Sequence, residues 1–451
     1  MLVRRSVREH AAIGLFLIKW LALAVPLGMV VGSACAFFLW ALDGVTVLRI
    51  QQPYLLFLLP LAGVAIVWLY QTYGESVAAG NNLIVDEIHQ PGGGVPLRMV
   101  PLVLVGTIVT HLCGGSAGRE GTAVQMGGSL ASGLAQRLPG MNRSDVRIIL
   151  MAGISAGFAG VFGTPVAAMI FALEVLSIGR ISYSAILPCL IAAIASDQSG
   201  LAWGIEHTHY HVASVLPAGS SLHIAPVDLM LLGKVALAGI AFGLASRVFA
   251  ELVHGLHRFL HRTVPSLLQP VLGGVIVVAL VFAVGTRDYL GLGVSSADPA
   301  AITIMSCFHA GGAGSWSWFW KLLFTAVTLS SGFKGGEVTP LFFVGAALGN
   351  ALAWVSGAPV DLFAALGFVA VFAGATNTPL ACTVMAVELF GGEFVVYYAT
   401  ACLLAYLFSG HSGIYVSQRV GTPKFGDSDF PAGTTLRGLR PPDGRARDRH
   451  V

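Results

Sequence analysis

The chain has 451 residues, of which 55% are hydrophobic and only 10% are charged, and its mean hydropathy is +0.79. Soluble domains carry about a quarter charged residues, so this composition predicts a protein that crosses a membrane several times. The net charge of +3 is too small to indicate a nucleic-acid partner. The six cysteines lie in apolar segments without CxxC spacing, which indicates small buried residues rather than a metal site.

Apolar segments follow one another along the chain with few polar residues between them. The first is too long for a secretory signal and lacks a small-residue cleavage site, so we expect it to be retained. A helix needs about 20 residues to cross a bilayer, and several segments are shorter. Helices that end inside a membrane must line a polar cavity or pack against protein, so the prediction is an all-α bundle of tilted and broken helices. The segments are residues 11–42, 54–70, 99–113, 123–135, 148–159, 165–176 and 184–195, and, after a polar insert at 203–226, 229–252, 270–284, 316–329, 340–355, 362–372, 379–390 and 394–408.

Glu120 is a lone carboxylate in this apolar sequence. Its only charged neighbour is Arg119, because the flanking residues 99–118 and 121–136 contain no other Asp, Glu, Lys or Arg. A carboxylate at membrane depth is costly and is kept mainly where it handles ions or protons. A second glycine-rich break carries Glu337, which we interpret as the counterpart of Glu120. Glycines before a helix leave its first amide hydrogens free for an anion, so two half-helices are predicted to face one ion site.

The chain also contains an internal repeat. Glu174 follows Pro165 by nine residues, and Glu388 follows Pro379 by nine residues, within similar apolar surroundings. Because the acid recurs at the same offset, we expect a structural role for both Glu174 and Glu388. Two repeats whose broken segments correspond are typical of transporters with a site at the repeat interface, and inverted halves are the usual arrangement. The repeats span approximately residues 54–200 and 229–408.

Arginines concentrate at both ends of the chain. The positive-inside rule therefore predicts that both termini are cytosolic. We expect the membrane to be the plasma or inner membrane of a prokaryote. Residues 421–451 have too few apolar residues to fold and are expected to form a disordered cytosolic tail after a transmembrane domain at 1–420. The arginines are Arg4, Arg5 and Arg8 at the N-terminus and Arg437, Arg440, Arg445, Arg447 and Arg449 at the C-terminus.

Several motifs together resemble the CLC family of anion channels and proton-coupled anion antiporters, over about residues 10–420. The motifs are Gly118–Gly121, the glycine-rich run to Pro165 and Glu174, the turn at Gly335–Pro340, and Tyr415 after Gly410. The resemblance implies a CLC-type fold, a homodimer with one anion pathway per subunit, and Glu120 as the gate. A deprotonated Glu120 would occupy the anion's own site, and burial would favour the proton uptake that makes it leave.

Three departures from the chloride-transporting members point to one branch of that family. Asn81 stands where those members have a serine at the first anion-binding helix, and Val175 replaces their internal proton-transfer acid. Glu337 replaces an apolar residue. Together these changes resemble the fluoride-exporting branch, CLC-F, and imply a proton-coupled fluoride antiporter without a cofactor. A chloride or nitrate antiporter is disfavoured by Asn81 and Val175, and a passive anion channel stays open as an alternative.

The resemblance also implies the site residues. Glu120 and Glu337 are expected to gate the pathway and transfer protons, with the Thr339 hydroxyl as a partner for either carboxylate. The expected anion-binding residues supply free helix amides or side-chain donors. They are Gly80, Asn81, Asn82, Gly118, Arg119, Gly121, Val338, Thr339 and Tyr415.

Two other patterns indicate different chemistry only superficially. Residues 114–118 fit the G-x-S-x-G motif of hydrolases, but that motif needs a preceding strand and a His–acid pair, and the flanks are helical in character. The alternating histidines of residues 206–211 could bind a metal, although we interpret the segment as a solvated loop. No ATP site or catalytic nucleophile is expected.

Overall fold

The computed structural model describes residues 2–213, 223–224, 227–294, 296, 298–426, 431 and 433–440, with side chains of the first helix from Glu9 onward. These residues form fifteen α-helices, which confirms the predicted all-α class. The helices are α1 (Leu2–Gln51), α2 (Leu59–Tyr73), α3 (Asn81–His89), α4 (Met99–Leu112), α5 (Glu120–Arg137), α6 (Arg143–Phe162), α7 (Pro165–Glu174), α8 (Ile186–Ala202), α9 (Leu229–Thr263), α10 (Gln269–Val284), α11 (Ser317–Ser330), α12 (Val338–Ser356), α13 (Val360–Thr376), α14 (Pro379–Phe390) and α15 (Val395–Phe408).

Short elements complete the described part. Strand β1 (Ser177–Ile178) pairs in parallel with β4 (Arg419–Val420), and β2 (His223–Ile224) pairs antiparallel with β3 (Val227–Asp228). The 3-10 helices are η1 (Pro53–Leu58), η2 (Glu75–Val77), η3 (Tyr183–Ala185) and η4 (Ser306–Phe308).

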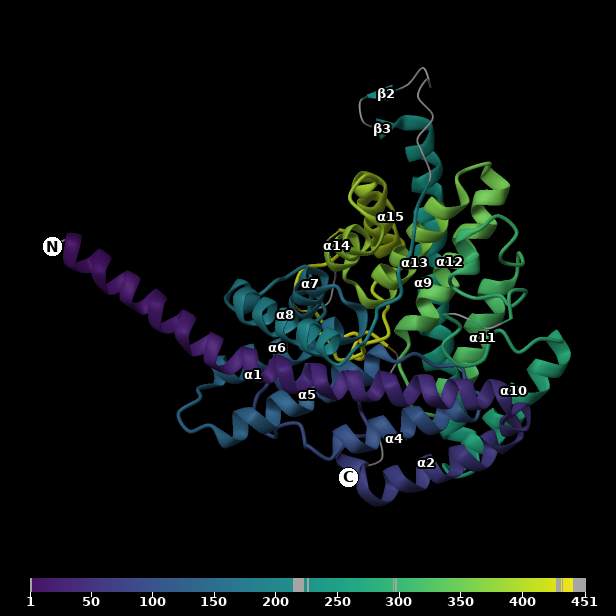
Figure 1. Ribbon diagram of the computed structural model, residues 1–451, viewed down its shortest axis with the longest axis horizontal. Helices are drawn as coiled ribbons and strands as arrows, with labels where there is room; N and C mark the ends of the chain where they lie inside the picture. The colour runs from purple at the N-terminus through teal and green to yellow at the C-terminus, as the bar shows by residue number, and fades with distance from the viewer. Residues whose placement is uncertain are drawn as a thin grey trace.

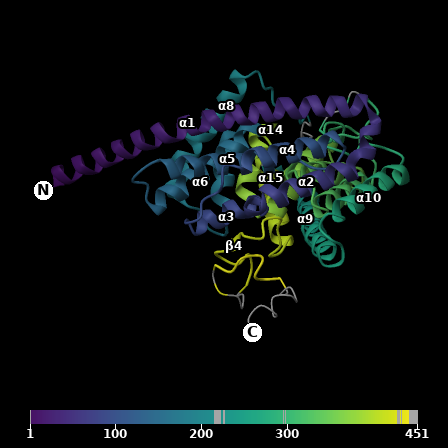
Figure 2. The ribbon, with the colours of Figure 1, turned by 90° about the horizontal axis from the view of Figure 1, so that it is seen from below.

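The helices are tilted and unequal in length, as the segment lengths predicted. Six described helical segments are long and apolar enough to cross a membrane, and six shorter apolar helices have 10–17 residues. Figures 1 and 2 show helices running in several directions, with the N-terminal part of the long α1 extending beyond the other helices; Figure 2 shows α1 along one edge. All six cysteines are free and buried, which confirms their interpretation as small apolar residues.

The two repeats place equivalent glycines at equivalent helix contacts. Gly127 on α5 packs against the backbone of Gly153 on α6, and Gly345 on α12 packs against Gly367 on α13. Gly153 and Gly367 each lie 12 residues before the proline that begins the next helix. In both pairs an added Cβ would overlap the partner's carbonyl oxygen. Small residues at such contacts let membrane helices approach closely, so the same device builds both halves of the molecule.

Glu174 and Glu388 join the repeats by capping each other's helices. Glu174, at the end of α7, accepts hydrogen bonds from two amides at the start of α14, and Glu388 accepts two from the start of α7. Helix starts have free amides that need such acceptors, and prolines begin both helices. This reciprocal contact makes α7 and α14 antiparallel and supports the structural role expected for both acids. The donors are Leu380 (3.2 Å), Ala381 (2.9 Å), Val166 (3.0 Å) and Ala167 (2.8 Å).

The C-terminal segment differs from the expected disordered tail. Leu436 is only 1% exposed and packs with Ile178 and Val420, and its amide donates a hydrogen bond to the Gln418 carbonyl. A single leucine is enough to order this segment because it completes a small apolar cluster whose other members lie on β1 and β4. Arg445, Arg447 and Arg449 lie outside the described residues, and the cytosolic orientation of the termini stays a prediction.

Candidate anion and proton site

Two glycine-rich loops meet where α5 and α12 begin. Gly118 and Gly336 exchange two backbone hydrogen bonds, of 2.6 and 2.8 Å, in an antiparallel bridge. A Cβ on Gly118 would lie 3.0 Å from the Gly336 carbonyl oxygen, and one on Gly336 would lie 2.8 Å from the amide nitrogen of Gly121. A side chain at either position would crowd the backbone of the opposite loop, so the bridge explains why both breaks contain glycine. The two helix starts that the sequence predicted to face each other do lie together.

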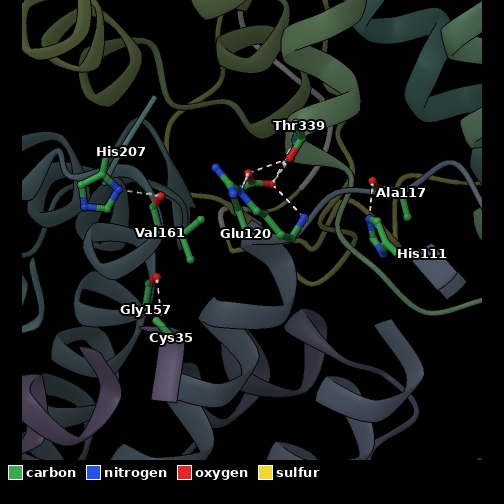
Figure 3. A network of polar contacts seen from close by, with 9 residues as sticks. Cys35, His111, Ala117, Glu120, Gly157, Val161, His207 and Thr339 are labelled. Carbon is green, nitrogen blue, oxygen red and sulfur yellow. Dashed lines mark hydrogen bonds and ion pairs between the residues drawn. The ribbon is translucent and has the colours of Figure 1, made fainter. Parts of the chain in front are cut away.

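The Glu120 carboxylate lies at the start of α12 rather than in solvent (Figure 3). It is 1% exposed, and its Oε2 accepts a hydrogen bond of 3.0 Å from the Thr339 amide. The Thr339 hydroxyl lies 2.6 Å from both carboxylate oxygens. The Arg119 amide donates to Oε2 at 3.2 Å, and the Arg119 Nε lies 3.7 Å from Oε1. A carboxyl group is therefore held at a helix N-terminus by a backbone amide and a hydroxyl, a position that favours an anion.

Glu337 does not occupy the position in its repeat that Glu120 occupies in the other. Arg119 is the N-cap residue of α5 and Glu120 its first residue, whereas Glu337 is the N-cap residue of α12. Because Gly118 pairs with Gly336, the residues that directly follow them also correspond, and Glu337 is the counterpart of Arg119. The Thr339 hydroxyl is also used by Glu120 and not by Glu337. The interpretation of Glu337 as the counterpart of the gate is wrong by one residue.

On one side of the bridge lies a cavity of about 160 Å³, which we call the Tyr415 cavity. Three predicted anion-binding residues from the start of α3 line it, together with Tyr415 and Glu337. The Asn81 amide oxygen is buried without a hydrogen-bond partner among the described residues. Gly80, Asn81 and Asn82 are the α3 residues concerned. Sequence positions more than 300 apart thus contribute donors to one polar space.

Tyr415 is fixed by hydrogen bonds around it. The Asn82 amide oxygen accepts from the Ser417 amide at 3.0 Å, which gives Asn82 a positioning role. The buried Gln418 side chain donates to the carbonyls of Val175 and Thr376, each at 3.0 Å. Tyr415 itself is 5% exposed, so these contacts hold its ring at the wall of the cavity.

Gly121 and Val338 directly follow Glu120 and Glu337 in the sequence. A Cβ on Gly121 would lie 3.2 Å from the Asn81 side-chain nitrogen and 3.7 Å from a Glu337 carboxylate oxygen. Val338 is the first residue of α12 and is buried. The predicted residues therefore form two adjoining groups, one around the Glu120 carboxylate and one around the Tyr415 cavity.

Two further spaces have Arg119 in their lining. A cavity of about 20 Å³ is lined by Arg119, Glu120 and Thr339 and by the loop residues Thr208 and Tyr210. A volume of this size holds about one water-sized species. Arg119 also lines a cavity of about 400 Å³, the Arg49 cavity, whose charged lining is Asp43, Arg49, Arg119, Glu206, Arg287, Asp288 and Asp298.

The histidine-containing loop, interpreted from the sequence as a solvated loop, contributes Glu206, Thr208 and Tyr210 to the lining of these two spaces. His207 Nε2 lies 3.3 Å from the Asp197 carboxylate, and its Nδ1 lies 3.2 Å from the Val161 carbonyl oxygen (Figure 3). The Tyr210 ring packs against three phenylalanine rings, with the nearest centroid, that of Phe368, at 5.2 Å. Anchors on both sides of Thr208 hold it beside the gate. The described residues include no group of three potential metal ligands.

Val175 lies in apolar surroundings beside the site. It lines a cavity of about 10 Å³ with Asn81, Tyr415 and five apolar residues. Nothing in that lining could exchange a proton readily at this position. Ser116, the serine of the hydrolase-like motif, is fully buried, and its hydroxyl lies 2.9 Å from the Thr325 hydroxyl. That pairing gives Ser116 no activating base.

Two residues of the Tyr415 cavity escaped prediction. Lys334 and Gln125 both line it. The signal for Lys334 was available, because Lys334 and Glu337 are the only charged residues within 322–360. Gln125 carried no such signal, since it follows Glu120 by five residues on a helix face that only the packing defines.

Broken apolar helices and a carboxylate held at a helix start are the features of a membrane ion-transport protein. The chain belongs to the voltage-gated chloride channel family, whose sequence model matches residues 62–410. Members of this family are ion channels and transporters.

Relatives and solved structures agree with this assignment. The chain is 51% identical over 416 residues to the chloride/fluoride channel protein of Pseudomonas syringae pv. tomato, covering 91% of this chain and 88% of that protein. A crystal structure of a CLC-type fluoride/proton antiporter superposes with a TM-score of 0.82 at 34% identity, covering 90% of this chain and 98% of the other. A slow cyanobacterial Cl⁻/H⁺ antiporter gives 0.68 at 19% identity over 87% of this chain and 94% of its own, which supports the fold alone. The predicted resemblance to the CLC family and to its fluoride-transporting members is confirmed.

Proposed function

We propose that this protein exchanges protons for fluoride and exports fluoride from the cytosol. The observation that carries the proposal is the Glu120 carboxylate at the start of α12, bound by the Thr339 amide and hydroxyl. Fluoride is small, hard and strongly hydrated, so it needs compact donors of this kind to replace its water. The similarity to proteins described as a chloride/fluoride channel and a fluoride/proton antiporter supports the same substrate.

The exchange follows from competition for one set of donors. A deprotonated Glu120 accepts the hydrogen bonds of Thr339 and excludes another anion from the start of α12. Protonation at a carboxylate oxygen removes the charge and weakens these charge-assisted bonds, so the side chain leaves. Fluoride from the Tyr415 cavity then takes the vacated donors. Loss of the proton returns the carboxylate and expels fluoride toward the Arg49 cavity.

Glu337 supplies a second protonatable group on the Tyr415 side. It lines the Tyr415 cavity and stands close to Gly121, the residue after the gate. On this proposal it carries protons between that cavity and Glu120, because Val175 cannot. A carboxylate at a helix start would otherwise repel the transported anion, so Glu337 is protonated when fluoride binds.

We further propose a homodimer in the plasma or inner membrane, with one pathway per subunit and the Tyr415 cavity open to the cytosol. The described face around α7 and α14 exposes apolar side chains, with Val166 at 40% and Leu380 at 50%, that a second copy or lipid would cover. Light scattering of the detergent-solubilised protein checks this point. The mass of a single chain would contradict the dimer.

The function is tested by replacing the Glu120 carboxyl group with a group that cannot ionise. In liposomes, Glu120→Gln keeps the size of the side chain but cannot become an anion, so a fluoride gradient should no longer drive protons. No coupled pH change should be seen, whether or not fluoride itself still passes through the variant. A Glu120→Gln variant that pumps protons uphill as well as the wild type would contradict the gate. Glu120→Asp, which keeps the acid, is the matched control and should retain partial coupling.

A further inference from the structure

Lys334 is the one positively charged side chain among the residues that line the Tyr415 cavity. The cavity also contains the Glu337 carboxylate, and the two charges are three residues apart on the loop before α12. The mechanism above uses Glu337 but gives no role to Lys334. On the proposed cycle Glu337 is protonated when fluoride binds, so Lys334 is then the one charged side chain in the lining and favours an anion there.

The lysine is held in place by packing. Its Nζ lies 4.2 Å from the centroid of the Tyr70 ring, within the range of a cation–π contact. Its side chain also passes close to α4, where a Cβ on Gly106 would lie 3.0 Å from the Lys334 Cβ. Tyr70 is 7% exposed, so the ring is a fixed support. The ammonium group is therefore fixed over an aromatic face at the cavity wall.

Lys334 is not neutralised by a close ion pair. Within the described part of the chain, the ion pairs within 4.0 Å do not include Lys334 with Glu337. Beside it, the Gln125 side chain has no hydrogen-bond partner among the described residues and approaches Gly80 at the start of α3. One cation and one free amide thus face the same polar space as Asn81.

We propose that Lys334, supported by Tyr70, forms an anion-capture site at the mouth of the Tyr415 cavity, with Gln125 as an additional donor. Its ligand is a small monovalent inorganic anion, which it holds before the anion reaches the donors at the start of α12. The inference rests on the proposed function for the direction of transport. A lysine that merely snorkels toward the membrane surface would pack its stem in the same way but would contribute no charge to binding.

The charge is tested by fluoride transport kinetics in liposomes, with fluoride titrated on the Tyr415 side. Lys334→Gln should raise the KM for fluoride about tenfold with a smaller change in kcat, the loss expected for one charge-assisted contact. Lys334→Arg should restore most of the affinity. The wild-type KM should increase with ionic strength, and that of Lys334→Gln should not. Lys234→Gln on α9, a lysine that does not line the Tyr415 cavity, is the matched control.

A chemical rescue separates charge from packing. Lys334→Cys should be rescued by 2-aminoethyl methanethiosulfonate, which restores an ammonium group, and further weakened by the 2-sulfonatoethyl reagent. The native cysteines are all buried, so background modification is low. Equal effects of the two reagents, or an unchanged KM in Lys334→Gln, would overturn the inference. A wild type that moves no fluoride refutes the proposed function instead, so the two failures are distinguishable.

Discussion

At the scale of residues, the proposed mechanism rests on one carboxylate that imitates the anion competing with it. Glu120 uses the amide and hydroxyl of Thr339, which are the donors that an incoming anion would need. Neither group carries a formal charge, and the nearest guanidinium nitrogen, Arg119 Nε, lies 3.7 Å from the carboxylate. Binding through partial charges at a helix start is firm but reversible, which suits transport better than a permanent ion pair.

Glu337, the second acid of the proposed mechanism, and Val175, which stands where chloride-transporting relatives are expected to carry an acid, give a paired prediction. Glu337→Gln should reduce proton-coupled fluoride transport by at least about tenfold, a typical loss when a proton-transfer group is removed. Val175→Ala should leave the coupling intact, because Val175 lies in an apolar pocket and carries no proton. Both are measured as fluoride-driven pH change in liposomes at equal protein content.

The opposite pattern would contradict the proton route. If Val175→Ala uncoupled a folded protein while Glu337→Gln pumped normally, protons would pass by position 175. Thr339→Ser serves as a control at the same site, since it keeps the hydroxyl that Glu120 uses.

The charged residues of the site could be found from the sequence because charge is rare in the chain. Glu120, Arg119 and Glu337 stand out in apolar surroundings, and the structure brings them to one bridge. The register of Glu337 could not be predicted, because counting from the prolines does not reveal which loop residue becomes the N-cap. Gln125 depends on the approach of α3 to α5, which only tertiary packing determines.

At the scale of elements, the repeat is built on close contacts between helix backbones. The pair Gly127–Gly153 joins α5 to α6, and the pair Gly345–Gly367 joins α12 to α13. These contacts hold α5 against α6 and α12 against α13 and so help to fix where the starts of α5 and α12 lie. The repeat and its prolines were predictable from the sequence. The glycine pairs were not, since Gly127 and Gly345 are two among 56 glycines and only the helix crossing distinguishes them.

Enlarging one of these glycines should therefore destabilise the protein. Gly367→Ala should lower stability by about 1–3 kcal/mol, the usual cost of overpacking, because the added methyl meets the Gly345 carbonyl group. Thermal unfolding in detergent, followed by size-exclusion chromatography with fluorescence detection, measures the shift. Gly233→Ala is the control, since a Cβ on this α9 glycine meets nothing within 4 Å. An equal effect of both substitutions would contradict the packing argument.

At the scale of the whole molecule, three polar spaces adjoin the glycine-rich loops of an apolar protein. The Tyr415 cavity is lined by Gly335 and Glu337, whereas the 20 Å³ space and the Arg49 cavity share Arg119 in their lining. Glu120 lines the 20 Å³ space, and on the proposed mechanism its side chain separates the two solutions. Composition predicted the membrane fold, and the two glycine-rich breaks predicted that two helix starts face each other. The contribution of Glu206, Thr208 and Tyr210 to the cavity linings was not predicted, because the polar residues of this loop resemble a solvated loop when read without their partners.

Proton movement driven by fluoride in the reconstituted wild-type protein tests the central claim most directly. Liposomes are loaded with fluoride and diluted into fluoride-free, weakly buffered medium with a pH electrode present. The account predicts that fluoride efflux drives protons inward and raises the external pH, and that an equal chloride gradient produces a much smaller flux. Protein-free liposomes control for leakage of hydrogen fluoride. Fluoride efflux without any proton uptake, or chloride flux equal to fluoride flux, would contradict the account.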